Sequence, residues 1–156
     1  MIRVVATGTF DILHPGHLWY LKESAQLGDE LYVIIARDAN IRHKPRPVIP
    51  EEQRRCMVEA LRPVTKAILG DLTDMYRPIR ELNPDIITLG CNQHFNPEIL
   101  ERTLEKQGMQ TKVVRISAFT NSPFTSSRDI VQEVIRRSDD MKRHIEPGDH
   151  SSGCDE

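Results

Sequence analysis

The chain has 156 residues, of which 38% are hydrophobic and 28% are charged. This length allows one domain with a substantial core and is too short for two ordinary domains. The formal net charge is only -2, which excludes an overall basic field that would hold nucleic acid or an anionic membrane. Any bound anion must therefore be held by a local group of residues.

The three cysteines, Cys56, Cys91 and Cys154, stand far apart and form no pair with the spacing of metal ligands. The sequence shows neither the pattern of a secretory leader nor a long apolar span. We therefore expect a cytoplasmic protein with reduced thiols.

The N-terminal third alternates between strand and helix patterns. The apolar run at residues 2–6 predicts a buried strand that ends in the turn Thr7-Gly8-Thr9. Residues 15–27 predict a helix, because Pro15 suits a first helical turn and leucines and alanines form an apolar stripe. Residues 31–36 are continuous in Val and Ile, which is typical of a strand covered on both faces.

The same alternation continues along the rest of the chain. Residues 37–50 contain three prolines and a cluster of cations, which indicates a restrained, irregular, basic loop. The expected elements that follow are a helix at 50–61, a strand at 66–69, a helix at 75–82, a strand at 86–89, a helix at 97–106, a strand at 112–116 and a helix at 126–137.

Strands that alternate with helices at short intervals predict an α/β fold. We expect a single doubly wound, Rossmann-like domain over residues 1–137, with a five-stranded parallel sheet flanked by helices. Residues 138–156 are polar and lack apolar periodicity, so we expect a disordered tail there. Ligands of such sheets bind beyond the carboxyl ends of the strands, which directs attention to the residues after each strand.

Two histidines stand three residues apart where the first helix should begin. If Pro15 is the first helical residue, His14 precedes the helix and His17 lies in its opening turn, so both imidazoles can reach one point. Helix N-termini offer unpaired N–H groups and partial positive charge, which favour a phosphate, and Gly16 leaves room for it. Two imidazoles there can donate hydrogen bonds to an α-phosphate during its displacement, which predicts phosphoryl-type transfer without a protein nucleophile.

The same two histidines have a structural interpretation as well. One imidazole could cap the helix while the other packs against it or binds zinc. Zinc is disfavoured, because no further Cys or His stands at ligand-like spacing in this segment. The setting of the pair, after a buried strand and around a Pro-Gly, favours the functional interpretation.

The string GTFDILHPGH at residues 8–17 resembles the signature of the HxGH nucleotidylyltransferase superfamily, in its cytidylyltransferase-like branch. The segments ARDANIRHKPRPVIPEEQRRCMVEALRPVTKAILGD, PDIITLG and SPFTSSRDIVQEVIRR are similar to archaeal FAD synthetases. The similarity runs from about residue 3 to residue 137. It implies transfer of AMP from ATP to FMN with release of pyrophosphate, and a divalent metal, Mg²⁺, carried with the nucleotide.

The resemblance also implies roles for particular residues. It implies that His14, His17 and Lys44 are catalytic and that a further set binds the nucleotide or its phosphates, namely Thr9, Phe10, Asp11, Asp38, Arg46, Gly90, Asn92, Arg115, Thr125, Ser126 and Ser127. Several of these roles have alternatives. Asp11 could bond backbone amides in its turn, Lys44 and Arg46 could lie in a solvated loop, and residues 125–127 could simply cap a helix. The role expected of Asp38 is to hold a ribose or a metal-bound water.

The residues do not decide between several functions. Archaeal FAD synthetases commonly carry cysteine before the Ser-rich motif, whereas here residues 121–124 read NSPF, so thiol chemistry in that loop is not required. One alternative is a CTP-dependent enzyme acting on glycerol 3-phosphate or another phospho-alcohol. The other is a nucleotide-binding regulator that has lost turnover. The resemblance further implies a homodimer, and nothing suggests a nucleic-acid or membrane partner or a metal held by the protein alone.

Overall fold

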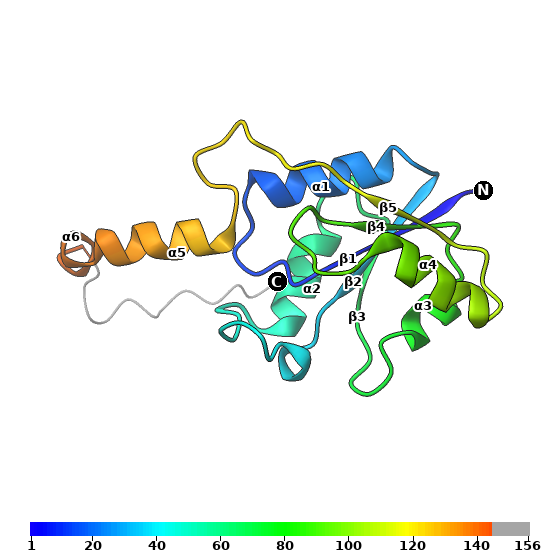
Figure 1. Ribbon diagram of the computed structural model, residues 1–156. Coiled ribbons are helices and arrows are strands. Elements are labelled where there is room, and N and C mark those ends of the chain that lie inside the picture. The colour runs from blue at the N-terminus through cyan, green and yellow to red at the C-terminus, as the bar shows by residue number, and fades with distance from the viewer. Residues whose placement is uncertain (145–156) are drawn as a thin grey trace, which may run out of the picture.

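Residues 1–144 of the chain are described by a computed structural model, and they form one α/β domain (Figure 1). The strands are β1 (Arg3–Gly8), β2 (Glu30–Ile35), β3 (Lys66–Leu69), β4 (Ile86–Leu89) and β5 (Lys112–Arg115). The helices are α1 (Pro15–Ala25), α2 (Glu51–Glu59), α3 (Arg77–Leu82), α4 (Pro97–Lys106), α5 (Ser127–Arg136) and α6 (Ser138–Lys142), with a short 3₁₀ turn, η1, at Asp38–Asn40. No helix among these residues is long and apolar enough to cross a bilayer.

The sheet is parallel throughout and has the strand order β3-β2-β1-β4-β5. In this register Val4 of β1 lies beside Leu31 of β2 on one side and Ile86 of β4 on the other. The chain therefore builds the sheet outward in one direction from β1 to β3 and then reverses to add β4 and β5. This order confirms the predicted doubly wound sheet and places its switch point between β1 and β4.

Helices cover both faces of the sheet, and β1 shows why. Val4 and Ala6 belong to an apolar cluster with α1 and α2, whereas Val5 belongs to a second cluster with α3 and α4. All three side chains are fully buried, because successive residues of a strand point to opposite faces. The continuous apolar runs in the sequence therefore indicate a sheet that lies between two layers of helices.

The C-terminal helices extend away from the sheet (Figure 1). Ser126 caps α5 through a capping box with Asp129, and none of the α5 residues is buried. The predicted disordered tail is wrong for residues 138–142, which form α6, because Asp139 and Asp140 suit a first helical turn and Lys142 a last turn. The rest of that prediction, from residue 145 onward, lies outside the described residues.

Candidate active site

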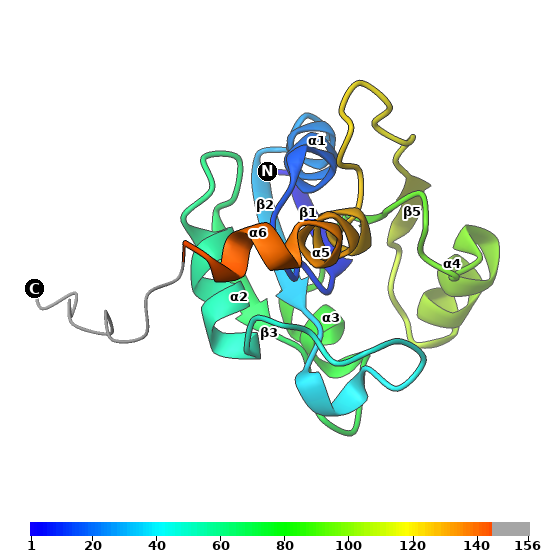
Figure 2. The ribbon, with the colours of Figure 1, turned by 90° about the vertical axis from the view of Figure 1, so that its left-hand side faces the viewer.

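The site lies at the carboxyl ends of the strands, where the segment after β1 enters α1. Figure 2 looks onto this edge of the sheet, with α5 pointing towards the viewer. Phe10 has a positive φ of 52° and a side chain that is only 3% exposed, so its ring turns back under the strand end. A Cβ on Gly8 would stand 2.7 Å from this ring, which is why the turn requires glycine there.

Phe10 has a structural role, and its predicted place in the turn that approaches the phosphates stays a prediction for the backbone. Its ring is part of the core and lies 5.2 Å from the ring of His17 and 6.1 Å from that of Tyr20, measured between centroids. The predicted contact of this residue with a nucleotide cannot come from its side chain, because burial under the turn takes precedence for a large apolar ring. The ring of Phe10 instead packs against the ring of His17.

The two histidines are stacked at the start of α1. Their ring centroids are 3.8 Å apart, with an angle of 28° between the ring planes. His14 is the N-cap of the helix, and its Nδ1 accepts a hydrogen bond of 3.0 Å from the backbone N–H of Gly16. A neutral His14 ring must then carry its proton on Nε2, which makes that nitrogen a donor. Helix capping and ligand binding are thus compatible in one side chain.

Glycine at position 16 permits this arrangement. A Cβ there would lie 2.8 Å from the ring of His14 and 3.1 Å from the carbonyl oxygen of Thr125. Contacts this short would displace either the imidazole or the start of α5. The spacing between the two histidines therefore depends on the glycine as much as on the helix.

Both imidazoles are held neutral. Burial, together with the nearby His14 and Lys44, lowers the pKa of His17 to about 3. Burial also lowers the pKa of His14, although Asp129 acts in the opposite direction. Nδ1 of His17 is buried and has no hydrogen-bond partner within residues 1–144. Near pH 7 the site thus offers neutral donors that do not repel each other.

The lowered pKa of His17 predicts a specific loss of stability in acid. The unfolded chain binds a proton at this residue below pH 6.5, whereas the folded protein resists it until about pH 3, so stability falls as the pH drops through this interval. His17→Gln has no such group and should lose less stability than the wild type between pH 7 and pH 4. Urea unfolding at a series of pH values measures the difference.

The exposed His43 provides the control for this experiment. His43→Gln should leave the free energy of unfolding at pH 7 as in the wild type, because residue 43 is exposed in the folded protein. Parallel curves for His17→Gln and the wild type would contradict the burial of a neutral imidazole.

The basic loop between η1 and α2 is tied to the turn after β1. Lys44 Nζ donates a hydrogen bond of 2.9 Å to Thr9 Oγ1, beside the histidines. The carboxylate of Asp11 accepts hydrogen bonds from the backbone N–H groups of Val48, at 3.0 Å, and Ile49, at 2.8 Å. Asp11 therefore accepts hydrogen bonds from backbone amides, as its structural alternative predicted. These amides belong to the basic loop, however, and not to the turn that contains Asp11.

Arg54 is the residue that the sequence analysis missed. Its side chain is 0% exposed and its guanidinium donates to the carbonyl oxygens of Ile49 at 2.9 Å, Thr9 at 2.5 Å and Ala36 at 2.9 Å. It also binds Asp38 Oδ1 at 2.7 Å. One buried cation therefore joins the ends of β1 and β2 to the basic loop. Its place four residues before the buried Val58, on the inward face of a helix, is the signal that could have revealed it.

Asp38 has a structural partner in Arg54, and its predicted contact with a ribose or a metal-bound water stays a prediction. Burial works to raise its pKa, but the hydrogen bonds from Arg54 and from the backbone of Glu51, with the charges of Arg54 and Arg46, lower the pKa overall. The Arg46 guanidinium is 3.8 Å from Asp38 and its side chain is 80% exposed. Arg46 is therefore the more available of the two groups, at the wall of an open cavity of about 540 Å³.

The loop after β4 is fixed by a second arginine. Arg115 donates to the carbonyl oxygens of Gly90, at 2.8 Å, and Gln93, at 2.9 Å, and also to that of Phe95. Arg115 therefore holds this loop, because one guanidinium serves three carbonyls, and its predicted contact with a nucleotide stays a prediction. Asn92 is exposed on the same loop.

The hydroxyl groups before α5 connect that helix to the histidine segment. Ser127 Oγ donates to the carbonyl oxygen of Ile12 at 2.8 Å, Ser126 caps the helix by accepting from the N–H of Asp129, and Thr125 Oγ1 donates to Asp129. A single N-cap does not explain this set, because Ser127 bonds outside the helix. The N-termini of α1 and α5 thus lie together, and both favour an anion. Phosphate binding by these hydroxyls stays a prediction.

Residues 5–133 match the model of the family described as cytidylyltransferase-like. This chain belongs to that family. Proteins named FAD synthase are similar to it over most of their length. The one from Methanospirillum hungatei JF-1 is 78% identical over 134 residues, covering 86% of each chain, and the one from Archaeoglobus profundus is 57% identical over 135 residues, covering 86% of this chain and 87% of the relative.

Solved structures of similar proteins agree with the family. A protein from Thermoplasma volcanium GSS1, described as a lipopolysaccharide core biosynthesis protein, has a TM-score of 0.75 and 48% identity, over 77% of this chain and 99% of that one. A protein of unknown function from Archaeoglobus fulgidus, with a TM-score of 0.63 and 18% identity over 78% of this chain and 93% of that one, shares the fold. The predicted resemblance to cytidylyltransferase-like proteins is thus confirmed.

Proposed function

We propose that the chain is an FMN adenylyltransferase, which transfers AMP from ATP to FMN and releases pyrophosphate. The observation that carries the proposal is the stacked pair of neutral histidines at the N-terminus of α1. The substrates are proposed from the similar proteins named FAD synthase, at up to 78% identity.

The transfer needs no covalent intermediate with the protein. A phosphate oxygen of FMN attacks the α-phosphorus of ATP in line, forming the new P–O bond as the bond to the β-phosphate oxygen breaks. The FMN phosphate is already an anion near neutral pH, so positioning and charge stabilisation replace a strong general base. Nε2 of His14 and a neutral His17 donate to the α-phosphate oxygens, where negative charge builds during the displacement.

Neighbouring groups support the other phosphates. Lys44, next to Thr9, provides a cation beside the histidines, and the N-terminus of α5 offers unpaired N–H groups to the departing pyrophosphate. Within residues 1–144 no three His, Cys, Asp or Glu side chains gather in a way that could hold a metal ion. We propose that Mg²⁺ enters with ATP, where it would neutralise charge on the leaving pyrophosphate.

A pyrophosphate-release assay that crosses two nucleotides with two acceptors tests this function. ATP with FMN should give turnover and a product with the mass of FAD, whereas CTP with glycerol 3-phosphate should not. Turnover with CTP and glycerol 3-phosphate alone would make the chain a phospho-alcohol cytidylyltransferase. Tight ATP binding with no product from either acceptor would indicate a nucleotide-binding regulator and contradict the proposal.

A further inference from the structure

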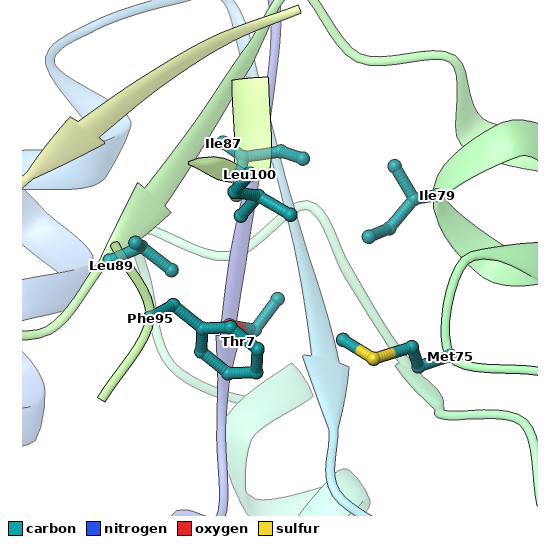
Figure 3. A pocket seen from close by; sticks show the side chains of 7 residues that line it. All are labelled: Thr7, Met75, Ile79, Ile87, Leu89, Phe95 and Leu100. Carbon is teal, nitrogen blue, oxygen red and sulfur yellow. The ribbon is translucent and has the colours of Figure 1, made fainter. Parts of the chain in front are cut away.

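A small apolar pocket lies on the opposite face of the sheet from the stacked histidines, between α3 and α4 (Figure 3). Its volume is about 30 Å³, enough for one methyl-sized group. Thr7 of β1 and Ile87 and Leu89 of β4 form its floor. The pocket therefore sits at the switch point of the sheet, where ligands of doubly wound folds bind.

Two exposed apolar side chains flank the mouth of this pocket. Met75 is 49% exposed and Phe95 is 44% exposed, and Figure 3 shows them on either side of Thr7. Large apolar groups left in water at the rim of a hole are typical of a surface that a ligand covers. Phe95 is held in place, because Arg115 binds its carbonyl oxygen, whereas the flexible Met75 can adjust to a flat ring.

The lining is almost without unpaired polar atoms. Thr7 is its polar residue, and the hydroxyl of that side chain already accepts a hydrogen bond from Gln93 Nε2 at 3.3 Å. An adenine would bury its ring nitrogens and amino group here without partners, which is unfavourable. ATP and FMN are the two proposed substrates. Of their ring systems, only the dimethylbenzene edge of the flavin is as apolar as this lining.

The distance to the reacting groups also fits a flavin. Thr7 and Thr9 are two residues apart, about 7 Å along an extended chain, and Lys44 binds Thr9. The ribityl chain of FMN spans a distance of this kind between its ring and its phosphate. A flavin edge over Thr7 would thus leave the phosphate at the strand end, near the basic loop.

We propose that this pocket takes one methyl group of the dimethylbenzene edge of the isoalloxazine ring, while the exposed Met75 and Phe95 at its mouth pack against the ring. The proposal rests on the proposed function, because it takes FMN as the acceptor. In this arrangement the residues between α3 and α4 select the acceptor, and the nucleotide binds on the side of the sheet that carries the histidines.

The test compares Met75→Gln with the matched control Met57→Gln, whose methionine is 57% exposed on α2, away from the pocket. Quenching of flavin fluorescence measures the Kd for FMN and for an analogue without the two ring methyl groups. Wild type should bind the analogue about tenfold more weakly than FMN, since each buried methyl group contributes to affinity. Met75→Gln should lose most of this preference and bind FMN more weakly, while its Kd for ATP and the behaviour of Met57→Gln stay as in the wild type.

The alternatives give different results. Equal binding of FMN and its analogue by the wild type would overturn the inference, even if the enzyme makes FAD. A weaker Kd for ATP with unchanged FMN binding in Met75→Gln would assign the pocket to adenine and would also overturn it. If the wild type neither binds FMN nor makes FAD, the proposed function itself fails, and that outcome is seen before any variant is compared.

Discussion

His17→Ala should lower kcat for FAD formation by about 100-fold to 1000-fold while the protein stays folded. The size follows from removing one preorganised donor to an oxygen on which charge develops in the transition state. His17 makes no side-chain hydrogen bond through Nδ1, so its loss breaks no contact of that nitrogen within residues 1–144. Single-turnover kinetics measure the chemical step, and circular dichroism checks the fold. A variant that keeps most of the wild-type rate would refute the role of the pair.

His14 allows the catalytic and capping roles of a histidine to be separated. Its Nδ1 accepts from the N–H of Gly16, and asparagine can replace that acceptor at an N-cap. His14→Asn should keep the stability of the protein yet lose turnover, whereas His14→Ala should lose turnover and about 1 kcal/mol of stability. If His14→Asn were as active as the wild type, the residue would be a helix cap and nothing more.

Arg54→Met should destabilise the protein by about 4 kcal/mol, because it leaves buried acceptors without a donor. The guanidinium serves three carbonyl groups and Asp38, and methionine fills similar space without serving any of them. For a domain of this size such a loss lowers Tm by about 10 °C. Calorimetry measures it. We also expect weaker substrate binding, since the Thr9 turn and the basic loop share this anchor.

The neighbouring Arg55 is the matched control. Its side chain is 22% exposed, and it forms ion pairs with Glu52 and Glu59, which are 61% and 41% exposed, both within one helical turn. Pairs with partners this exposed contribute little, so Arg55→Met should lower Tm much less than Arg54→Met does. Arg54→Lys distinguishes charge from geometry, because one ammonium group cannot reach four acceptors. A Tm for Arg54→Met equal to that of Arg55→Met would contradict the anchoring role.

Three of the predicted site residues have structural roles with a common physical cause. Asp38, Asp11 and Arg115 are charged residues at strand ends, where sequence analysis expects ligand contacts. Strand ends are also where several loops converge, and their backbone amides and carbonyls need partners once water is excluded. In this protein those three side chains satisfy backbone groups of the site. Their charges are thus matched within the protein, although Asp38 also lines the open cavity beside Arg46.

The sequence by itself determined the order of strands and helices, the two-sided burial of the sheet and the position of His14 and His17 at a helix start. Each of these follows from neighbours within a few residues, through apolar periodicity and the preferences of Pro15 and Gly16. Only the tertiary structure decided that Arg54 is a buried anchor and that an apolar pocket opens between α3 and α4. Arg54 meets Thr9 across 45 residues of chain, and the pocket is lined by residues of β1, α3, β4 and α4, so no local pattern could specify either contact.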